Sequence, residues 1–123
     1  MVQSGLTINE YLGTTVVTFG QPSVLDGLVI EAIGNELFAL VDEKAKRRII
    51  LDFTSVKFLS SAMIGVFIST HRKAAAINGQ VVLCGVRDEI MKVFKIMKLE
   101  KVFKFAENEE AALKILGSHA LTA

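Results

Sequence analysis

Two short apolar runs on either side of a helix-like segment constrain the fold more than any other feature of the chain. The runs cover residues 49–53 and 81–86, and polar or charged residues flank both. Runs of this length and composition are typical of strands buried on both faces of a sheet. Ser60-Ser61 and Asn78-Gly79 are start and stop signals for a helix between them. The order strand, helix, strand predicts a right-handed crossover that joins two parallel strands.

The amino-terminal part of the chain adds a hairpin and a helix. Residues 6–8 and 15–19 are predicted strands, and Gly13-Thr14 between them is typical of a turn. Ser23 is expected to cap a helix that continues to about residue 43. Apolar residues recur in this helix at steps of three and four, which places them on one face. That face consists of Leu25, Leu28, Val29, Ala32, Leu37, Leu40 and Val41.

The carboxyl-terminal part adds two helices and a short strand. Asp88 is expected to cap a helix through about residue 98, and residues 102–105 have the composition of a strand. A last helix is predicted over residues 108–116, ended by Gly117. The inner face of the helix that starts at Asp88 is predicted to carry Ile90, Met91, Phe94 and Met97.

Together these elements predict one α/β domain over residues 1–123, with 117–123 as a frayed tail. The sheet is expected to be mixed, with about four or five strands and a parallel centre. About four helices would pack against it. A length of 123 residues fits a single domain.

Composition and charge exclude several classes of function. The net charge is +1, so no global basic field draws in nucleic acid, and direct nucleic-acid binding is not expected. No stretch reaches the ~18 to 20 apolar residues that a membrane-spanning helix needs. Residues 1–5 lack the basic start of a secretion signal, so we expect a cytoplasmic protein. Cys84 is the only cysteine, which excludes an internal disulfide.

Catalytic and cofactor-binding patterns are absent from the sequence. There is no nucleophile elbow and no glycine-rich phosphate loop. His71 and His119 have no neighbours at metal-ligand spacing, and Cys84 is interpreted as a small core residue. Asp52 is interpreted as a carboxylate that fixes the loop after its strand, since no partner for acid–base chemistry is visible. We therefore expect neither an enzyme nor a bound cofactor or metal.

Lysines recur at every third position near the end of the chain. On a helix this spacing is close to one face for two turns, which suits either a nucleic-acid or lipid patch or a solvated helix face. The solvated face is favoured because no aromatic residue is clearly exposed among the lysines. The lysines are Lys92, Lys95, Lys98, Lys101 and Lys104.

The segment IILDFTSVKFLSSAMIGV, residues 49–66, carries the pattern that points most directly to a function. A buried strand ends at Asp52, and the following loop is predicted to tuck Val56 and Phe58 inward. Ser60 and Ser61 then lie at a helix start, where free N–H groups and the helix dipole favour negative charge. These serines are interpreted either as a helix cap or as a phosphorylation switch.

The segment LDFTSVKFLSSAMIGV resembles the signature of the STAS domain, as in bacterial anti-sigma factor antagonists. The resemblance continues through GQVVLCGVRDEIMKVFKIMKLEKVFKF. It implies a binding protein whose partner is an anti-sigma factor serine/threonine kinase. In that family the unphosphorylated antagonist displaces a sigma factor, and phosphorylation ends the complex.

The alignment with the family pattern Asp-Ser-Ser/Thr-Gly-hydrophobe-Gly has departures. The family Asp falls on Ser60, the usual phosphate acceptor on Ala62 and the first Gly on Met63, while Gly65 matches the second Gly. Scaffold-type relatives in stress-sensing complexes use the residue that aligns with Ser61. The resemblance therefore implies Ser61 as the phosphate acceptor and Ser60 as the alternate.

The docking surface that the resemblance implies lies at this helix start and in the loop before the first helix. Two alternatives remain open: a scaffold or constitutive module that assembles with other STAS proteins without a phosphorylation switch, and a domain that senses a nucleotide or lipid. The residues expected to bind the partner are Ser23, Leu25, Asp26, Ser60, Ser61, Ala62 and Met63.

Overall fold

The computed structural model describes residues 4–20 and 27–117, and within them five strands form one mixed sheet against four helices. This arrangement confirms the predicted fold class. Strand order in the sheet follows chain order, from β1 to β5. The elements are β1 (Leu6–Tyr11), β2 (Thr14–Phe19), α1 (Gly27–Asp42), β3 (Arg48–Asp52), α2 (Ser61–Ala76), β4 (Gln80–Cys84), α3 (Asp88–Ile96), β5 (Lys104–Ala106) and α4 (Glu109–Ile115).

The sheet has an antiparallel edge and a parallel centre, as predicted. Strands β1 and β2 form the antiparallel hairpin, and β2 to β5 pair in parallel. The hairpin turn lies one residue earlier than expected, at Leu12 and Gly13, because both have positive φ, at 51° and 84°. A two-residue turn with positive φ at both positions matches the right-handed twist of the strands that it joins.

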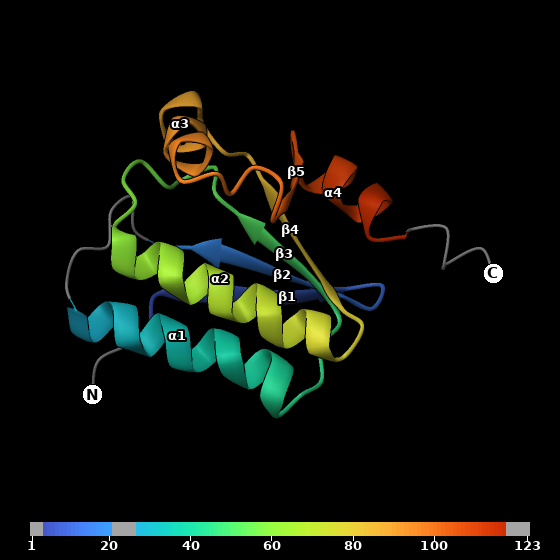
Figure 1. Ribbon diagram of the computed structural model, residues 1–123. Helices are drawn as coiled ribbons and strands as arrows, with labels where there is room; N and C mark the ends of the chain where they lie inside the picture. Colours follow the sequence, from blue (N-terminus) through green and yellow to red (C-terminus); the bar gives the residue numbers. More distant parts are fainter. Residues whose placement is uncertain (1–3, 21–26, 118–123) are drawn as a thin grey trace.

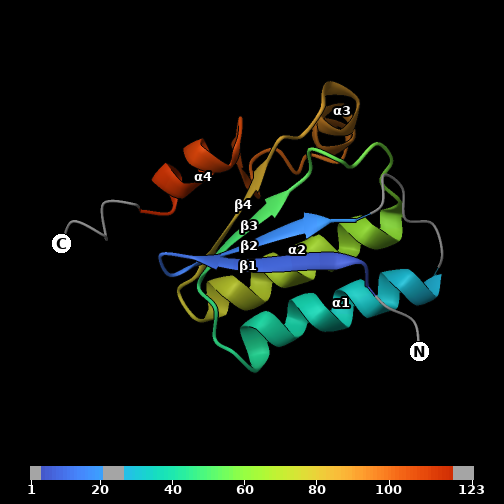
Figure 2. The ribbon, with the colours of Figure 1, turned by 180° about the vertical axis from the view of Figure 1, so that it is seen from behind.

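Helices cover both faces of the sheet. Figures 1 and 2 show α1 and α2 side by side on one face and α4 on the opposite face. The central strand β3 alternates accordingly: Ile49 and Leu51 belong to the larger core under α1 and α2, and Ile50 to the smaller core under α4. All three side chains are fully buried, so β3 is covered on both faces, as its apolar run predicts.

Helices α1 and α2 pack closely and begin at the same edge of the sheet (Figure 1). Gly34 lies in the middle of α1, where a Cβ atom would be 3.5 Å from Cγ2 of Val66 in α2. That is an ordinary van der Waals distance, so an added Cβ atom would fit, and Gly34 marks a point where the two helices pack against each other. The amino-terminal ends of α1 and α2 lie at the carboxyl ends of β2 and β3, which is the usual functional edge of such sheets.

Two residues predicted on inner helix faces are exposed instead. Leu28 in the first turn of α1 is 60% exposed. Met97 is 44% exposed because α3 ends at Ile96 and Lys98 has a φ of 58°, which turns the chain away from the helical path. Ile90 and Phe94 are buried, as predicted for that helix.

Three local predictions need correction. Asp88 does not cap α3: it is the first helical residue, and the N-cap position is Arg87, which makes no side-chain cap bond. The last strand covers Lys104–Ala106 rather than residues 102–105, since a turn precedes it. The proposed lysine stripe does not follow one helix, because α3 ends before Lys98. The predicted cap Ser23 lies outside the described residues.

None of the helices in the described ranges is both long enough and apolar enough to cross a membrane.

Candidate functional site

The loop after β3 is organised by the carboxylate of Asp52. Its Oδ1 accepts hydrogen bonds from the Thr54 N–H at 2.9 Å and from the Thr54 hydroxyl at 2.6 Å. Asp52 is 8% exposed and pairs in the sheet with Cys84 of β4. The carboxylate therefore fixes the chain as it leaves the strand, which is the role that its position led us to expect.

Gly85 supports this loop from the neighbouring strand. It follows β4 with a φ of 66°, a conformation that L side chains rarely adopt. A Cβ atom at this position would collide with the Thr54 hydroxyl and would lie 3.3 Å from Oδ1 of Asp52. Only glycine fits between the β4 end and the Asp52–Thr54 turn.

Ser60 and Ser61 occupy adjacent positions with different environments. Ser60 is the N-cap of α2, and its hydroxyl accepts a hydrogen bond from the Met63 N–H at 3.2 Å. Ser61 is the first helical residue and is exposed. The hydroxyl of Ser61 makes no hydrogen bond within residues 4–20 and 27–117, and the first turn of α2 carries no acidic side chain.

The loop before α2 exposes a large aromatic side chain, contrary to the sequence-based prediction. Val56 is buried, as expected, but Phe58 is 64% exposed. Phe58 stands beside a groove of about 440 Å³ between this loop and α3. In the described part of the chain, Nε of Arg87 is buried without a hydrogen-bond partner. The groove is lined by Lys57, Phe58, Leu59, Arg87, Glu89, Ile90 and Val93.

The structure divides the residues expected to bind the partner into three groups. Ser60, Ser61 and Ala62 lie together at the start of α2, with Ser61 and Ala62 exposed. Met63 is only 2% exposed and packs in the larger core, so its side chain cannot face a partner; its helical position turns it inward. The expected partner-binding residues Ser23, Leu25 and Asp26 lie outside the described residues.

On the α4 face of the sheet, Asp52 meets a second carboxyl group. Glu109 begins α4, and a hydrogen bond to Asp52, burial and the charge of Asp52 raise the pKa of Glu109 to about 7. Burial opposes ionisation of Asp52, but the hydrogen bonds from Glu109 and Thr54 outweigh it and lower the Asp52 pKa. The two carboxyl groups thus share one proton over much of the acidic range.

The same surroundings make Cys84 inert. Burial, together with the charges of Asp52 and Glu109, raises the pKa of its thiol to about 12. A thiol that stays protonated at neutral pH is a poor nucleophile and a poor metal ligand. Cys84 is fully buried in the smaller core, which agrees with its interpretation as a core residue.

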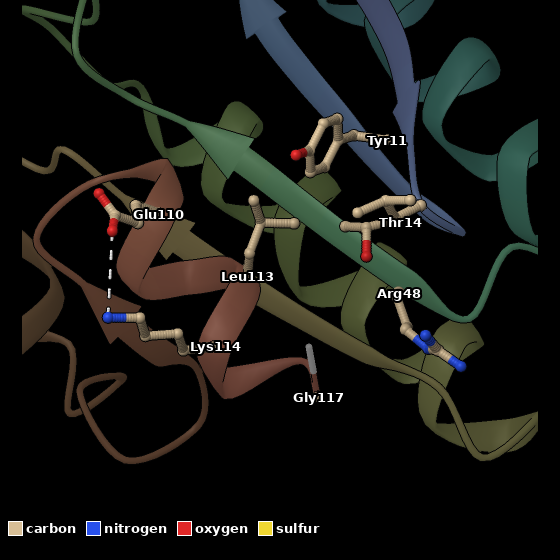
Figure 3. Close-up of a pocket in the computed structure, with 8 residues that line it drawn as sticks. Tyr11, Thr14, Arg48, Glu110, Leu113, Lys114 and Gly117 are labelled. Atoms are coloured by element: carbon tan, nitrogen blue, oxygen red, sulfur yellow. Dashed lines mark ion pairs between the residues drawn. The ribbon is translucent and has the colours of Figure 1, made fainter. Parts of the chain in front are cut away.

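A second cavity lies at the opposite edge of the sheet, where the parallel strands begin. Figure 3 shows Leu113 projecting from α4 toward the strands, and the ion pair between Glu110 and Lys114 lies at the rim. The cavity measures about 210 Å³. That volume lies below the range of roughly 300–1,000 Å³ that small-molecule sites usually occupy. Its lining is Tyr11, Leu12, Thr14, Arg48, Glu110, Leu113, Lys114 and Gly117.

Metal-ligating groups do not gather in the described ranges: no cluster of three His, Cys, Asp or Glu side chains there could hold an ion. The arrangement at the start of α2 offers no nucleophile paired with a base. It offers an exposed hydroxyl at a helix start, an exposed phenyl ring and a groove beside them. Such a surface suits recognition by another protein.

Comparison with known proteins identifies the family of this chain. The model of the STAS domain family matches residues 6–112. The chain belongs to the STAS domain family. BtrV of Bordetella bronchiseptica, named as a candidate anti-sigma factor antagonist, is 32% identical over 72% of this chain and 76% of its own length.

Solved STAS structures share the fold. An anti-sigma-factor antagonist domain protein from Planctomyces limnophilus superposes with a TM-score of 0.81, at 20% identity, over 92% of this chain and 98% of the other. The phosphorylated form of the Bacillus cell fate determinant SpoIIAA gives a TM-score of 0.70, at 22% identity, over 89% of this chain and 98% of the other.

Sequence reasoning missed three residues that the structure places at or near this edge. Phe58 is predicted to tuck inward, and no local signal distinguishes an exposed phenyl ring there. Arg87 gave no signal because its groove forms only when α3 packs against the loop before α2. Glu109 could have been noticed as an acidic residue at a helix start, but its contact with Asp52 depends on tertiary structure.

Proposed function

We propose that this STAS domain is an anti-sigma factor antagonist that binds an anti-sigma factor serine kinase through the start of α2, and that phosphorylation of Ser61 ends the complex. The observation that carries the proposal is the contrast between the two serines. The Ser60 hydroxyl is engaged as the helix cap, whereas Ser61 is exposed at the start of α2, on the candidate docking surface.

The chemistry of phosphorylation fits this position. A phosphate on Ser61 would add close to two negative charges at neutral pH. The positive end of the α2 dipole and hydrogen bonds from its first N–H groups would stabilise that charge. The first turn of α2 carries no acidic side chain that would repel it. The fold would therefore tolerate the modification, while a bulky anion would separate Phe58 and its neighbours from a partner.

The surface also indicates what kind of group a partner presents. Phe58 and Leu28 are exposed apolar side chains near the two helix starts that share this edge (Figure 1). The buried Nε of Arg87 in the adjacent groove would be satisfied by a carboxylate or carbonyl oxygen. A partner with an apolar side chain beside an acidic group would match both features. BtrV and SpoIIAA support the proposal through their names, which describe antagonists and a phosphorylated form.

The direct test is phosphate mapping with serine kinases of the organism from which the gene comes. The purified chain is incubated with ATP, magnesium and each kinase, and added phosphate is located by mass spectrometry. Phosphate is expected on Ser61 in the natural chain and in Ser60→Ala, and none is expected in Ser61→Ala. Phosphate confined to Ser60, or present in Ser61→Ala, would contradict the assignment.

Binding to the same kinase then tests the consequence. Ser61→Glu is expected to weaken binding about tenfold or more, since a charge enters the docking surface, whereas Ser61→Ala should bind like the natural chain. Titration calorimetry measures both. Equal binding by the two variants would argue against a switch. Large assemblies with other STAS proteins, seen by size-exclusion chromatography in both variants, would favour the scaffold function instead.

A further inference from the structure

The end of α3 forms a second exposed surface that the proposed function does not use. Ile96 is 79% exposed, the highest value among the large apolar residues that the structure describes, and Met97 and Val102 are 44% and 37% exposed. Two successive turns hold these residues: the Lys98 N–H bonds to the Lys95 carbonyl, and the Val102 N–H to the Leu99 carbonyl. We call this surface the basic tip; its residues are Lys95, Ile96, Met97, Lys98, Lys101 and Val102.

Positive charge surrounds the apolar side chains of the basic tip. Lys95, Lys98 and Lys101 are exposed, and Lys92 lies one turn earlier on α3. Within residues 4–20 and 27–117 none of these lysines forms an ion pair, in contrast to Lys46, Lys73 and Lys114. Glu100 is the acidic residue of this stretch, and its Oε2 is buried. The four lysines outnumber Glu100, so residues 92–102 carry a net charge of +3, whereas the whole chain carries only +1.

The shape of the tip favours a flat partner over an enclosing one. A side chain that lines a groove loses exposure to the groove walls, so Ile96 at 79% exposure must protrude from the surface. Figures 1 and 2 show α3 at the periphery of the molecule, away from α1 and α2. Protruding apolar side chains among lysines match the interface of an anionic bilayer, where the apolar groups enter the headgroup region and the lysines meet lipid phosphates.

We infer that the basic tip docks the protein on membrane surfaces rich in anionic lipid. Ile96 and Met97 insert at the interface, and Lys92, Lys95, Lys98 and Lys101 face the headgroups. Each lysine near an anionic surface strengthens binding by about fivefold, so four lysines give a combined effect of several hundredfold. This is weak, reversible and salt-sensitive attachment, and it differs from insertion of a membrane-spanning helix.

The basic tip is separate from the surface proposed to bind the kinase. It lies at the far end of α3, whereas the groove beside Phe58 is lined by residues of the first half of that helix. The nine residues of α3 extend about 13 Å at 1.5 Å per residue. Loss of membrane binding at the basic tip can therefore be distinguished from loss of kinase binding at the start of α2.

Vesicle flotation tests the inference directly. The full chain is mixed with vesicles of equal parts phosphatidylglycerol and phosphatidylcholine, or of phosphatidylcholine alone. Binding is expected only with phosphatidylglycerol, and it should vanish near 1 M salt, where the Debye length falls to about 3 Å. Absence of binding to phosphatidylglycerol vesicles at low salt would overturn the inference and leave an acidic protein partner as the occupant.

Paired variants locate the contact. Lys95→Gln/Lys98→Gln should reduce binding by about tenfold or more, whereas Lys44→Gln/Arg72→Gln removes the same charge elsewhere and should have less than a threefold effect. All four side chains are exposed and lack ion pairs in the described ranges. Equal losses in the two double variants would mean that net charge alone drives binding, and the basic tip would be rejected.

The chain contains no tryptophan, so a single introduced one reports insertion without background. Ile96→Trp is expected to show blue-shifted emission when phosphatidylglycerol vesicles are added. Leu12→Trp is the matched control, because Leu12 is 55% exposed in the hairpin turn, remote in sequence from α3. A shift in Leu12→Trp and none in Ile96→Trp would refute the proposed orientation.

Discussion

Ser60 and Ser61 show how two neighbouring and identical residues acquire different uses. Ser60 adopts extended backbone angles, φ −89° and ψ 160°, which direct its hydroxyl back to the Met63 N–H. Ser61 is one step inside the helix, where its side chain points outward. A substitution at Ser60 therefore acts on the helix, and a substitution at Ser61 acts on the surface.

This difference predicts opposite effects on stability. Ser60→Ala should lower the free energy of unfolding by about 1 kcal/mol, because it removes the cap of α2. Ser61→Glu should leave that free energy unchanged or raise it by about 0.3–1 kcal/mol, because it places negative charge at the helix start. Urea denaturation followed by circular dichroism measures both, with Ser61→Ala as the control.

Equal destabilisation by the two substitutions would contradict this difference between Ser60 and Ser61. If Ser61→Glu destabilises the fold as much as Ser60→Ala does, then weaker binding by Ser61→Glu could arise from partial unfolding. The binding measurement would then no longer support a phosphorylation switch, and the phosphate mapping would be its remaining test.

Helix α4 is short, yet it closes the second face of the sheet and brings Glu109 to Asp52. Asn108 caps it through a hydrogen bond from the Ala111 N–H at 2.9 Å. Ala112 and Leu116 pack on the smaller core with Cys84. The carboxyl pair thus joins α4 to the same loop that leads to Ser61.

The carboxyl pair predicts a pH dependence of stability. The Glu109 pKa is about 7 in the folded chain and 4.5 ordinarily, so the folded state holds its proton more tightly. Its contribution is complete below pH 4.5 and is lost as the pH rises through 7. Because Glu109 is exposed, we expect a loss of no more than about 1 kcal/mol. The lowered pKa of Asp52 acts in the opposite direction, only below its ordinary value of 3.8.

Denaturation at about pH 5.5 and about pH 8.5 brackets the titration of Glu109 and tests this dependence. Glu109→Gln should flatten it, since the amide still donates to Asp52 but does not titrate. Glu110→Gln is the matched control on the next residue and should keep the natural slope. A slope that survives in Glu109→Gln would show that another group is responsible.

The agreement between sequence and structure at this scale follows from local physics. Residues 49–53 and 81–86 predicted central strands correctly because apolar runs bounded by polar residues need burial on both faces. The helix between them starts at Ser61 and ends before Asn78, whose φ of 61° stops it. The exposure of Phe58 depends on how its loop packs, which periodicity alone does not contain. Helix α3 ends in a local turn where Lys98 has a φ of 58°, and the glycine that usually signals such an end is absent.

At the scale of the whole molecule, the fold separates three surfaces. The carboxyl edge of the sheet presents Ser61 and Phe58, the far end of α3 presents the basic tip, and the opposite edge holds the small cavity beside Tyr11. One partner can therefore occupy the carboxyl edge while the basic tip faces a membrane. Replacement of a binding residue on one of these surfaces should also leave binding at the other two surfaces unchanged.

Phe58 gives the sharpest test of this separation. Phe58→Ser should weaken kinase binding by about 10- to 100-fold, because buried aromatic side chains contribute most to such interfaces. Its effect on the free energy of unfolding should stay within about 0.5 kcal/mol, since the ring is 64% exposed. Titration calorimetry and urea denaturation provide the two measurements.

Tyr11→Ser is the matched control for this variant. It removes an aromatic ring that is 55% exposed at the opposite edge of the sheet, beside the small cavity. It should leave both kinase affinity and vesicle binding unchanged. If Tyr11→Ser weakened kinase binding as much as Phe58→Ser, the partner would have to reach both edges of the sheet. The docking surface would then extend along the hairpin, and the start of α2 would be one part of it.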